Sequence, residues 1–293
     1  MRTALFIVLA AVAAGFLAIW LAAIAGQAWK RRPGWLEAGV GFITNVFDTL
    51  GIGSFATTSA FFKLWGMVPD EEIPGTLVVG HTPPSLLQAF IFIAVVQVDF
   101  ATLVLMIASS AVGAWLGAGI VSRLPRRRIR VAMGSALLAA AAVMAMTQLQ
   151  WIPGGGESLG LSGASLALAM AGNLVFGALM TLGIGLYAPC MILVSLLGMN
   201  PRAAFPIMMG SCAVLMSVGS VPFIRSERYS LKAALGLTVG GIPGVLLATY
   251  VVKSLPLGAV RWLVVAVVIY TAAMMLRSAM LERRANREAV AEA

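Results

Sequence analysis

The chain contains a glycine-interrupted apolar segment twice, at a constant separation. The sequence Thr49-Leu-Gly-Ile-Gly-Ser-Phe-Ala returns 132 positions later (181 − 49) as Thr181-Leu-Gly-Ile-Gly-Leu-Tyr-Ala. Further identities keep this register without a gap: Leu64 with Leu196, Gly66 with Gly198, Met67 with Met199, Pro69 with Pro201 and Pro74 with Pro206. The chain is therefore predicted to consist of two homologous halves, residues 36–150 and 164–277, joined by a glycine-rich connector at 151–163.

The composition indicates that lipid surrounds these halves. Sixty per cent of the residues are hydrophobic, 11% are charged, and the mean hydropathy is +0.97. Soluble chains carry about a quarter charged residues, so an all-α polytopic membrane protein is predicted, with the lipid bilayer as a partner. The net charge of +9 comes from short loops between apolar runs. This pattern is typical of cytoplasmic loops, and no nucleic-acid partner is expected.

The apolar runs define the expected spans. An N-terminal unit, residues 1–35, holds an apolar run at 4–26 and a basic flank that begins at Lys30. The run is too long for the core of a signal peptide and is interpreted as a retained transmembrane helix. The charged tail, residues 278–293, is predicted to be cytoplasmic. The other apolar segments are 36–66, 73–95, 100–121, 129–149, 164–198, 203–224, 231–252 and 258–277.

The distribution of basic residues decides how the first segment of each half is inserted. If both segments are re-entrant hairpins, 16 of the 20 basic residues, including the five arginines between positions 123 and 130, lie on one side of the membrane. If both cross, the division is 10 to 10. The positive-inside rule favours the hairpins. Each half then has one re-entrant hairpin and three transmembrane helices, and the odd number of crossings makes the halves inverted repeats.

This topology, with one extra N-terminal transmembrane helix, predicts a multi-pass protein of the inner (plasma) membrane. The N-terminus is expected outside and the C-terminus in the cytoplasm. Four basic residues remain outside: Arg2, Arg202, Lys253 and Arg261.

The two glycine turns are predicted to form a substrate site near the membrane midplane. Glycines at 51, 53, 183 and 185 permit torsions that other residues avoid, and each turn precedes a helix-length segment. Free N–H groups and the positive end of a helix dipole suit an anion. The alternative is that these glycines only allow close helix packing. The predicted substrate-binding residues are Gly51, Ile52, Gly53, Ser54, Thr57, Thr58, His81, Gly183, Ile184, Gly185, Tyr187, Ser211 and Cys212.

Two of the ionisable residues have alternative interpretations. Asp48 lies next to the first turn, and a carboxylate within the membrane predicts a proton or sodium site, with Asn45 beside it. A cap on the turn, or a position that water reaches, is the alternative. His81 is the only histidine. It can relay protons or contact an anion, or it can be a structural, hydrogen-bonded residue.

Catalysis is not expected. One histidine and the two cysteines, Cys190 and Cys212, lie on different segments and supply neither a nucleophile–base pair nor a metal cluster. The cysteines are interpreted as packing residues. The chain has no phosphate-binding loop of the GxxxxGK[ST] type, which disfavours a primary pump. We therefore expect no cofactor and no metal.

Two Gly-Ile-Gly segments, each leading to a Leu-x-Gly-Met-x-Pro turn, resemble the TauE/SafE sulfite exporter family over roughly residues 36–277. Half two has Pro189 after its glycines where half one has Thr57, and the N-terminal helix lies outside the repeats. The resemblance implies transport of a small sulfur-containing or organic anion, such as sulfite, a sulfonate or sulfoacetate, driven by an ion gradient.

The leading interpretation is thus a secondary anion transporter that works by alternating access, coupled to H⁺ or Na⁺. A transporter of a cation or neutral solute that uses Asp48 is one alternative. A non-transporting membrane scaffold is another. A homo-oligomer is compatible with each of these interpretations.

Overall fold

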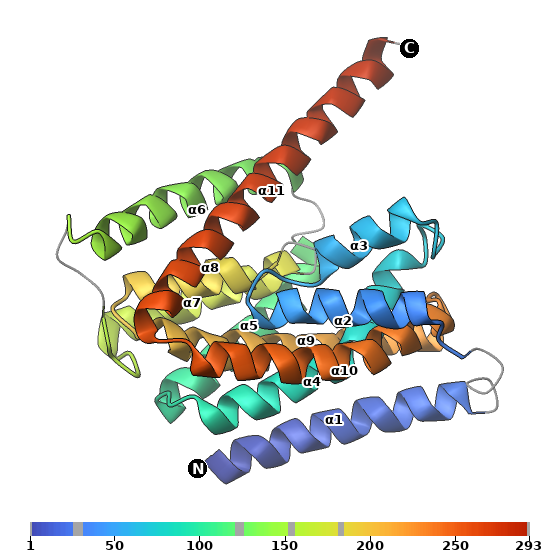
Figure 1. The fold of residues 1–293 in the computed structure, drawn as a ribbon, viewed down its shortest axis with the longest axis horizontal. Helices are drawn as coiled ribbons and strands as arrows, with labels where there is room; N and C mark the ends of the chain where they lie inside the picture. The colour runs from blue at the N-terminus through green and yellow to red at the C-terminus, as the bar shows by residue number, and fades with distance from the viewer. Residues whose placement is uncertain (1, 26–31, 121–125, 152–155, 181–184, 292–293) are drawn as a thin grey trace.

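The computed structural model describes residues 2–25, 32–120, 126–151, 156–180 and 185–291 (Figure 1). Within these residues the chain is helical, and the only β-type pairing recorded is an isolated bridge between Ser158 and Met199. The all-α expectation is confirmed. The helices are α1 (Arg2–Ile24), α2 (Trp35–Thr49), α3 (Phe55–Leu64), α4 (Ile73–Val95), α5 (Phe100–Ile120), α6 (Arg126–Gln148), α7 (Gly163–Met180), α8 (Tyr187–Leu196), η2 (Pro201–Ala203), α9 (Ala204–Arg225), α10 (Leu231–Ser254) and α11 (Leu257–Ala291).

The apolar segment 36–66 folds as two short helices. The break lies at the first glycine turn, where Gly51 has φ +94° and Gly53 has φ +88°. The 15-residue α2 and the 10-residue α3 are each shorter than the roughly 20 residues that cross a hydrocarbon core. In Figure 1 α2 runs into the molecule, and α3 returns toward the side on which α2 begins.

The ends of α3 and α8 have matching backbone geometry. Gly66 and Gly198 both have positive φ, +57° and +88°. The Met67 N–H donates to the carbonyl of Phe62, and the Met199 N–H to that of Val194, both at 3.0 Å. A glycine with positive φ, followed by a residue whose N–H donates to the carbonyl five positions earlier, is the usual Schellman helix end. The duplicated Leu-x-Gly-Met sequence therefore stops both helices in the same way.

The two halves interlock through helix pairs. α2 packs along α10, α5 along α7, α4 along α9 and α6 along α11. Small residues allow α2 to lie close to α10 and α5 to lie close to α7. A Cβ at Gly240 would overlap the carbonyl of Ala38, and one at Gly177 would overlap the carbonyl of Ser110. Each broken segment is therefore held by a helix of the opposite half.

Six helices within the described residues are long and apolar enough to cross a membrane: α1, α4, α7, η2 with α9, α10 and α11. The 18-residue α7 is among them, although the sequence assigned residues 164–198 to a hairpin. The apolar stretches of α5 and α6, Phe100–Leu116 and Arg130–Met146, are shorter than these six spans.

The last helix does not stop at the expected boundary of the membrane domain. α11 continues from Leu257 to Ala291, through position 277, as one helix. Arg130 on α6 donates to Ser278 at 3.0 Å and pairs with Glu282 at 3.4 Å. The start of the predicted tail is therefore packed against α6.

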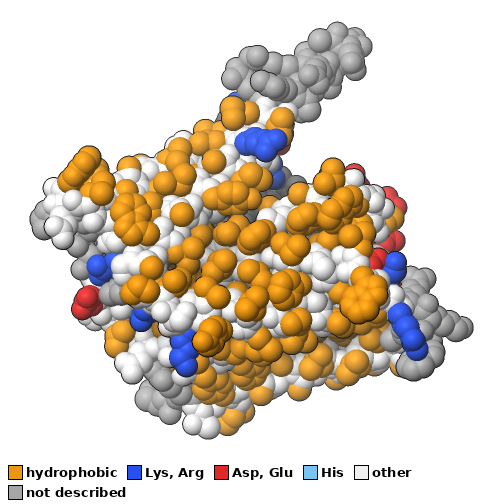
Figure 2. Space-filling view, in the orientation of Figure 1, with side chains coloured by type: hydrophobic (Ala, Val, Ile, Leu, Met, Phe, Trp, Pro, Cys, Tyr) orange, Lys and Arg blue, Asp and Glu red, His pale blue; other side chains and the backbone are white. Residues whose placement is uncertain are grey.

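The surface is apolar over the middle of the helix bundle. In Figure 2 hydrophobic side chains cover most of the visible face, and the Lys, Arg, Asp and Glu side chains lie mainly toward its two sides and on the projecting part of α11. On α10 the exposed apolar residues include Val239, Leu246 and Tyr250. Exposed apolar side chains on a helix that is long enough to span are typical of lipid contact.

Candidate functional site

The first glycine turn is closed by its own backbone and by Asp48. The N–H of Gly51 donates to the Asp48 carbonyl at 2.9 Å, and the N–H of Ile52 to the Phe47 carbonyl at 3.0 Å. The N–H of Ser54, at the start of α3, donates to Oδ1 of Asp48 at 2.7 Å. The carboxylate thus occupies the position at the positive end of α3 where the sequence predicted an anion.

Asp48 is buried, with 4% of its surface exposed, and its other partners are neutral. Nε2 of Gln88 on α4 donates to Oδ2 at 3.0 Å. The hydroxyl of Tyr187, on α8 of the second half, donates to the same oxygen at 3.3 Å. The ion pairs found among the described residues lie elsewhere, at Lys63–Asp70, Arg130–Glu282 and Lys232–Glu37. Asp48 is therefore held by hydrogen bonds from both halves, and no cationic side chain of the described segments pairs with it.

Gln88 connects Asp48 to a residue that sequence reasoning did not select. Its Nε2 also donates to Oγ1 of Thr49 at 2.8 Å, and that hydroxyl donates to the Asn45 carbonyl at 2.7 Å. The Oε1 of Gln88 is buried and has no hydrogen-bond partner. The amide of Gln88, in the middle of the apolar segment 73–95, could have been recognised in the sequence as a candidate site residue, because buried polar groups in membranes need partners.

His81 joins two other predicted residues. Its Nδ1 lies 3.3 Å from Oδ1 of Asn45, and its Nε2 lies 2.9 Å from Oγ1 of Thr58. Asn45 donates through Nδ2 to the Gly41 carbonyl at 2.7 Å, so its Oδ1 is left to accept from the histidine. With Nδ1 protonated and Nε2 accepting from Thr58, a neutral histidine satisfies both contacts. All three side chains are fully buried.

Three further residues of the first turn have local roles. Oγ1 of Thr57 donates to the carbonyl of Ser54 at 2.8 Å. This bond to the local backbone uses the hydroxyl hydrogen that would otherwise be available to a ligand. Gly51 lies against the second half, since a Cβ there would come 2.8 Å from Cε of Met191. Ile52 is half-buried and packs against the main core.

The second half contributes a smaller polar group. Oγ of Ser211 accepts from Nδ2 of Asn173 at 3.4 Å, and the same amide donates to the Met106 carbonyl at 2.6 Å. Sγ of Cys212 lies 3.8 Å from Sδ of Met180 and is close to the Tyr187 hydroxyl. Asn173 was not predicted. Like Gln88, it is a buried amide in an apolar segment.

The second glycine turn is described only in part. Gly183 and Ile184 lie outside the residues that the structure describes. Gly185 is exposed, and a Cβ there would have open space around it. The structure thus brings Tyr187 to the first turn and does not describe a matching anion-binding loop in the second.

Spanning helices around a buried carboxylate and its amide, hydroxyl and imidazole neighbours define a polytopic helical membrane protein with a polar interior. Residues 1–144, just under half of the 293-residue chain, match the model of the family described as Sulfite exporter TauE/SafE. The match confirms the resemblance seen in the sequence. It covers the N-terminal helix, which had been placed outside the family pattern, and it does not extend into the second half. Comparison with curated proteins and with solved structures found no match.

Proposed function

We propose that the protein is a secondary transporter. It moves a small sulfur-containing or organic anion, of the sulfite, sulfonate or sulfoacetate type, across the plasma membrane by alternating access. The match of residues 1–144 to the TauE/SafE family model supports an anion as the substrate. The observation that carries the proposal is Asp48, a buried carboxylate whose partners among the described residues are neutral donors from both halves. An ionisable residue of this kind inside a membrane protein is expected to be functional.

The hydrogen bonds of Asp48 suggest how an ion and an anion are coupled. The Ser54 N–H, the Gln88 amide and the Tyr187 hydroxyl all donate to the ionised carboxylate. When Asp48 is protonated, its negative charge is removed and these donors become free to bind an oxyanion. The anion therefore enters with a proton, because the two negative charges compete for one set of donors. Proton–anion symport follows from this competition.

An inverted-repeat architecture supports alternating access. The matching ends of α3 and α8, together with the exchange of partners in the pairs α2–α10 and α7–α5, are what two homologous halves around a pseudo-two-fold axis would give. We propose that α2 with α3 and α7 with α8 are re-entrant hairpins that open to opposite sides. In this topology the N-terminus is outside and the C-terminus is cytoplasmic.

Sodium is the second candidate for the coupling ion. The unpartnered Oε1 of Gln88 belongs to the side chain that contacts both Asp48 and Thr49. A rotation of this amide by half a turn would place three oxygens around one point, and hard cations prefer oxygen ligands. The same oxygens also suit the alternative in which the transported solute is itself a cation.

Transport by purified protein in liposomes tests the proposal. Uptake of radiolabelled sulfite or a sulfonate is measured with an imposed proton gradient, an imposed sodium gradient, or neither. Accumulation that depends on the proton gradient and is lost in Asp48→Asn supports symport. Accumulation that follows sodium selects the second ion. Failure of every anion to enter, while a cation does enter, would overturn the proposed substrate class.

A further inference from the structure

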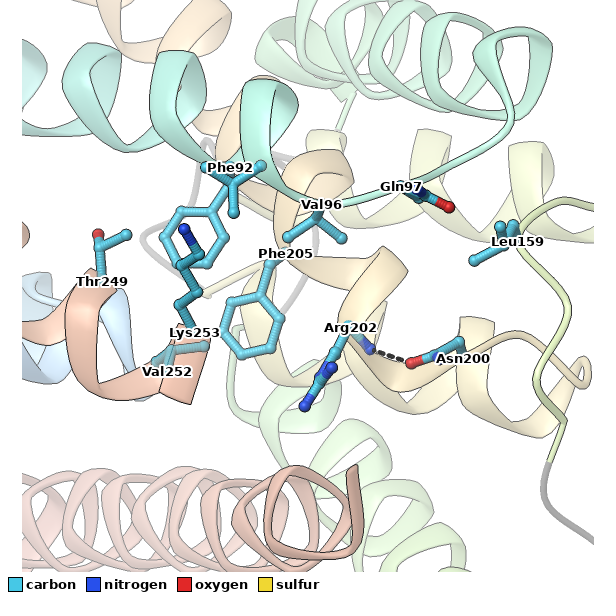
Figure 3. A pocket seen from close by; sticks show the side chains of 11 residues that line it. Phe92, Val96, Gln97, Leu159, Asn200, Arg202, Phe205, Thr249, Val252 and Lys253 are labelled. Carbon is cyan, nitrogen blue, oxygen red and sulfur yellow. Dashed lines mark hydrogen bonds between the residues drawn. The ribbon is translucent and has the colours of Figure 1, made fainter. Parts of the chain in front are cut away.

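A second polar feature lies away from the Asp48 network, at one end of the bundle. A cavity of about 410 Å³ opens between the end of α4, the start of α9, the end of α10 and the connector (Figure 3). Ligand pockets for small molecules have volumes of about 300–1,000 Å³. The cavity therefore has room for a small organic anion or for a hydrated inorganic one.

The lining of the cavity carries positive charge and no carboxylate. Arg202 and Lys253 both contribute to it, and none of the other lining residues is an aspartate or glutamate. These are two of the four basic residues that the topology leaves outside. Neither takes part in the ion pairs recorded for the described residues. A concave site lined by one sign of charge concentrates ions of the opposite sign.

Arg202 is held in place with part of its guanidinium unused. Its backbone N–H donates to Oδ1 of Asn200 at 3.0 Å, and its Nη2 donates to the Leu255 carbonyl. Its Nε is buried and has no partner. A buried donor without a partner costs free energy, and an arginine fork is well suited to an oxyanion.

Thr249 gives an independent indication of a ligand. It lines the same cavity from α10, one turn before Lys253, and only 8% of its surface is exposed. Its Oγ1 has no hydrogen-bond partner, not even the helix carbonyl that buried threonines commonly use. A buried hydroxyl without a partner, in a cavity whose lining also includes Arg202 and Lys253, is a free hydrogen-bond donor for a bound anion.

We propose that this cavity is an oxyanion-binding vestibule, with Arg202, Lys253 and Thr249 as its ligands. Its inner wall includes the stacked rings of Phe92 and Phe205, whose centroids are 5.3 Å apart. On α4, Phe92 is one helical turn from Gln88, which contacts Asp48. A role of the vestibule in supplying the Asp48 network rests on the proposed function. Oxyanion binding in the cavity does not.

Sulfate binding to the purified full-length protein, measured by titration calorimetry in lipid-free detergent, tests this assignment. We expect Lys253→Gln and Thr249→Val each to weaken binding by about tenfold, which corresponds to the loss of one good hydrogen bond or charge contact. Thr249→Ser keeps the hydroxyl and should restore binding. Thr249→Val removes a hydroxyl without a protein partner, so folding should be unaffected. The matched control is Lys63→Gln, an exposed lysine outside the cavity lining.

A phospholipid phosphate has the same oxyanion chemistry, so the second arm adds phosphatidylglycerol in place of sulfate. Thermal stabilisation by this lipid that is lost in Lys253→Gln and Thr249→Val supports the oxyanion site and assigns it to a headgroup. Sulfate binding with the same dependence assigns it to a soluble ion. If neither anion has an effect that these two variants reduce, the vestibule is overturned. Sulfate binding that Lys253→Gln and Thr249→Val reduce, in protein that does not accumulate anions in liposomes, would leave this site standing and overturn only the transport mechanism, so the two failures are distinguishable.

Discussion

The hydroxyl of Tyr187 donates to Oδ2 of Asp48 at 3.3 Å, although the two residues are 139 positions apart in the chain. This bond joins the first residue of α8 to the end of α2, and so joins the two halves at the buried carboxylate. A change in the charge of Asp48 therefore alters hydrogen bonds to both halves. Such a shared contact is a physical means by which an ion can bias a movement of one half against the other.

Replacement of Asp48 by asparagine should separate transport from coupling. The asparagine side chain cannot ionise, but its amide oxygen can still accept from the Ser54 N–H. We expect gradient-driven accumulation of labelled anion in liposomes to be abolished, while exchange of internal for external anion persists. Asp70→Asn, a change at an exposed residue, is the control. If Asp48→Asn retains both accumulation and exchange, Asp48 has no coupling role.

The bond between Tyr187 and Asp48 should appear as non-additivity. Tyr187→Phe and Asp48→Asn each remove part of one contact, so the double variant should lose less stability than the sum of the single losses. Residues in one hydrogen-bond network show interaction energies of about 0.5–3 kcal/mol. Chemical unfolding of the four proteins in detergent measures this. An interaction energy of zero would mean that the contact does not form in solution.

Close packing of α2 on α10 should be sensitive to a single methyl group. A Cβ at Gly240 would overlap the Ala38 carbonyl, so Gly240→Ala should lower the free energy of unfolding by about 1–3 kcal/mol, as overpacking does. Gly39 on α2 has open space around it. Gly39→Ala should therefore be neutral, or stabilising by up to about 1 kcal/mol, because alanine favours helix. Equal effects of the two changes in thermal unfolding would contradict the packing account.

Valine substitutions at Gly53 and Gly185 should show whether the glycine turns form the anion site. Gly53 has φ +88°, which a β-branched residue strongly disfavours, so Gly53→Val should distort the turn and abolish anion uptake. A Cβ at Gly185 would have open space around it, so Gly185→Val should impair uptake only if the second turn also touches the anion. Both variants are measured in liposomes at matched expression. Normal uptake in both variants would contradict the assignment of the anion-binding site to the glycine turns.

His81 is expected to act as a structural residue. His81→Phe leaves Oδ1 of Asn45 and the Thr58 hydroxyl without their partner, and each buried unsatisfied group costs about 1–3 kcal/mol. His81→Gln keeps a donor and an acceptor, so it should retain most of the stability and the proton-driven uptake. A glutamine variant that folds normally but no longer accumulates anion would indicate a proton relay instead.

Much of the site could be found from the sequence because it is local. Asp48, Gly51, Gly53 and Ser54 belong to one turn, and a carboxylate beside glycines within an apolar segment is a visible anomaly. Gln88 and Asn173 were equally anomalous amides and were missed. Their partners, Asp48 and Ser211, lie 40 and 38 positions away. Only the fold shows that these amides face polar groups and not their own helices.

The sequence by itself determined the membrane class, most of the helix positions and the repeated glycine motif, and it indicated the TauE/SafE resemblance, because hydropathy, glycine turns and repeated motifs are local or linear properties. Tertiary structure decided which residues meet. It placed Tyr187 of the second half on Asp48 of the first, while Ser211 joined Asn173 instead. It also gathered Arg202, Lys253 and Thr249 around one cavity. Such contacts depend on how helices that are distant in the chain pack against each other. This packing is set by shape complementarity at small residues such as Gly240. No linear sequence pattern specifies that complementarity.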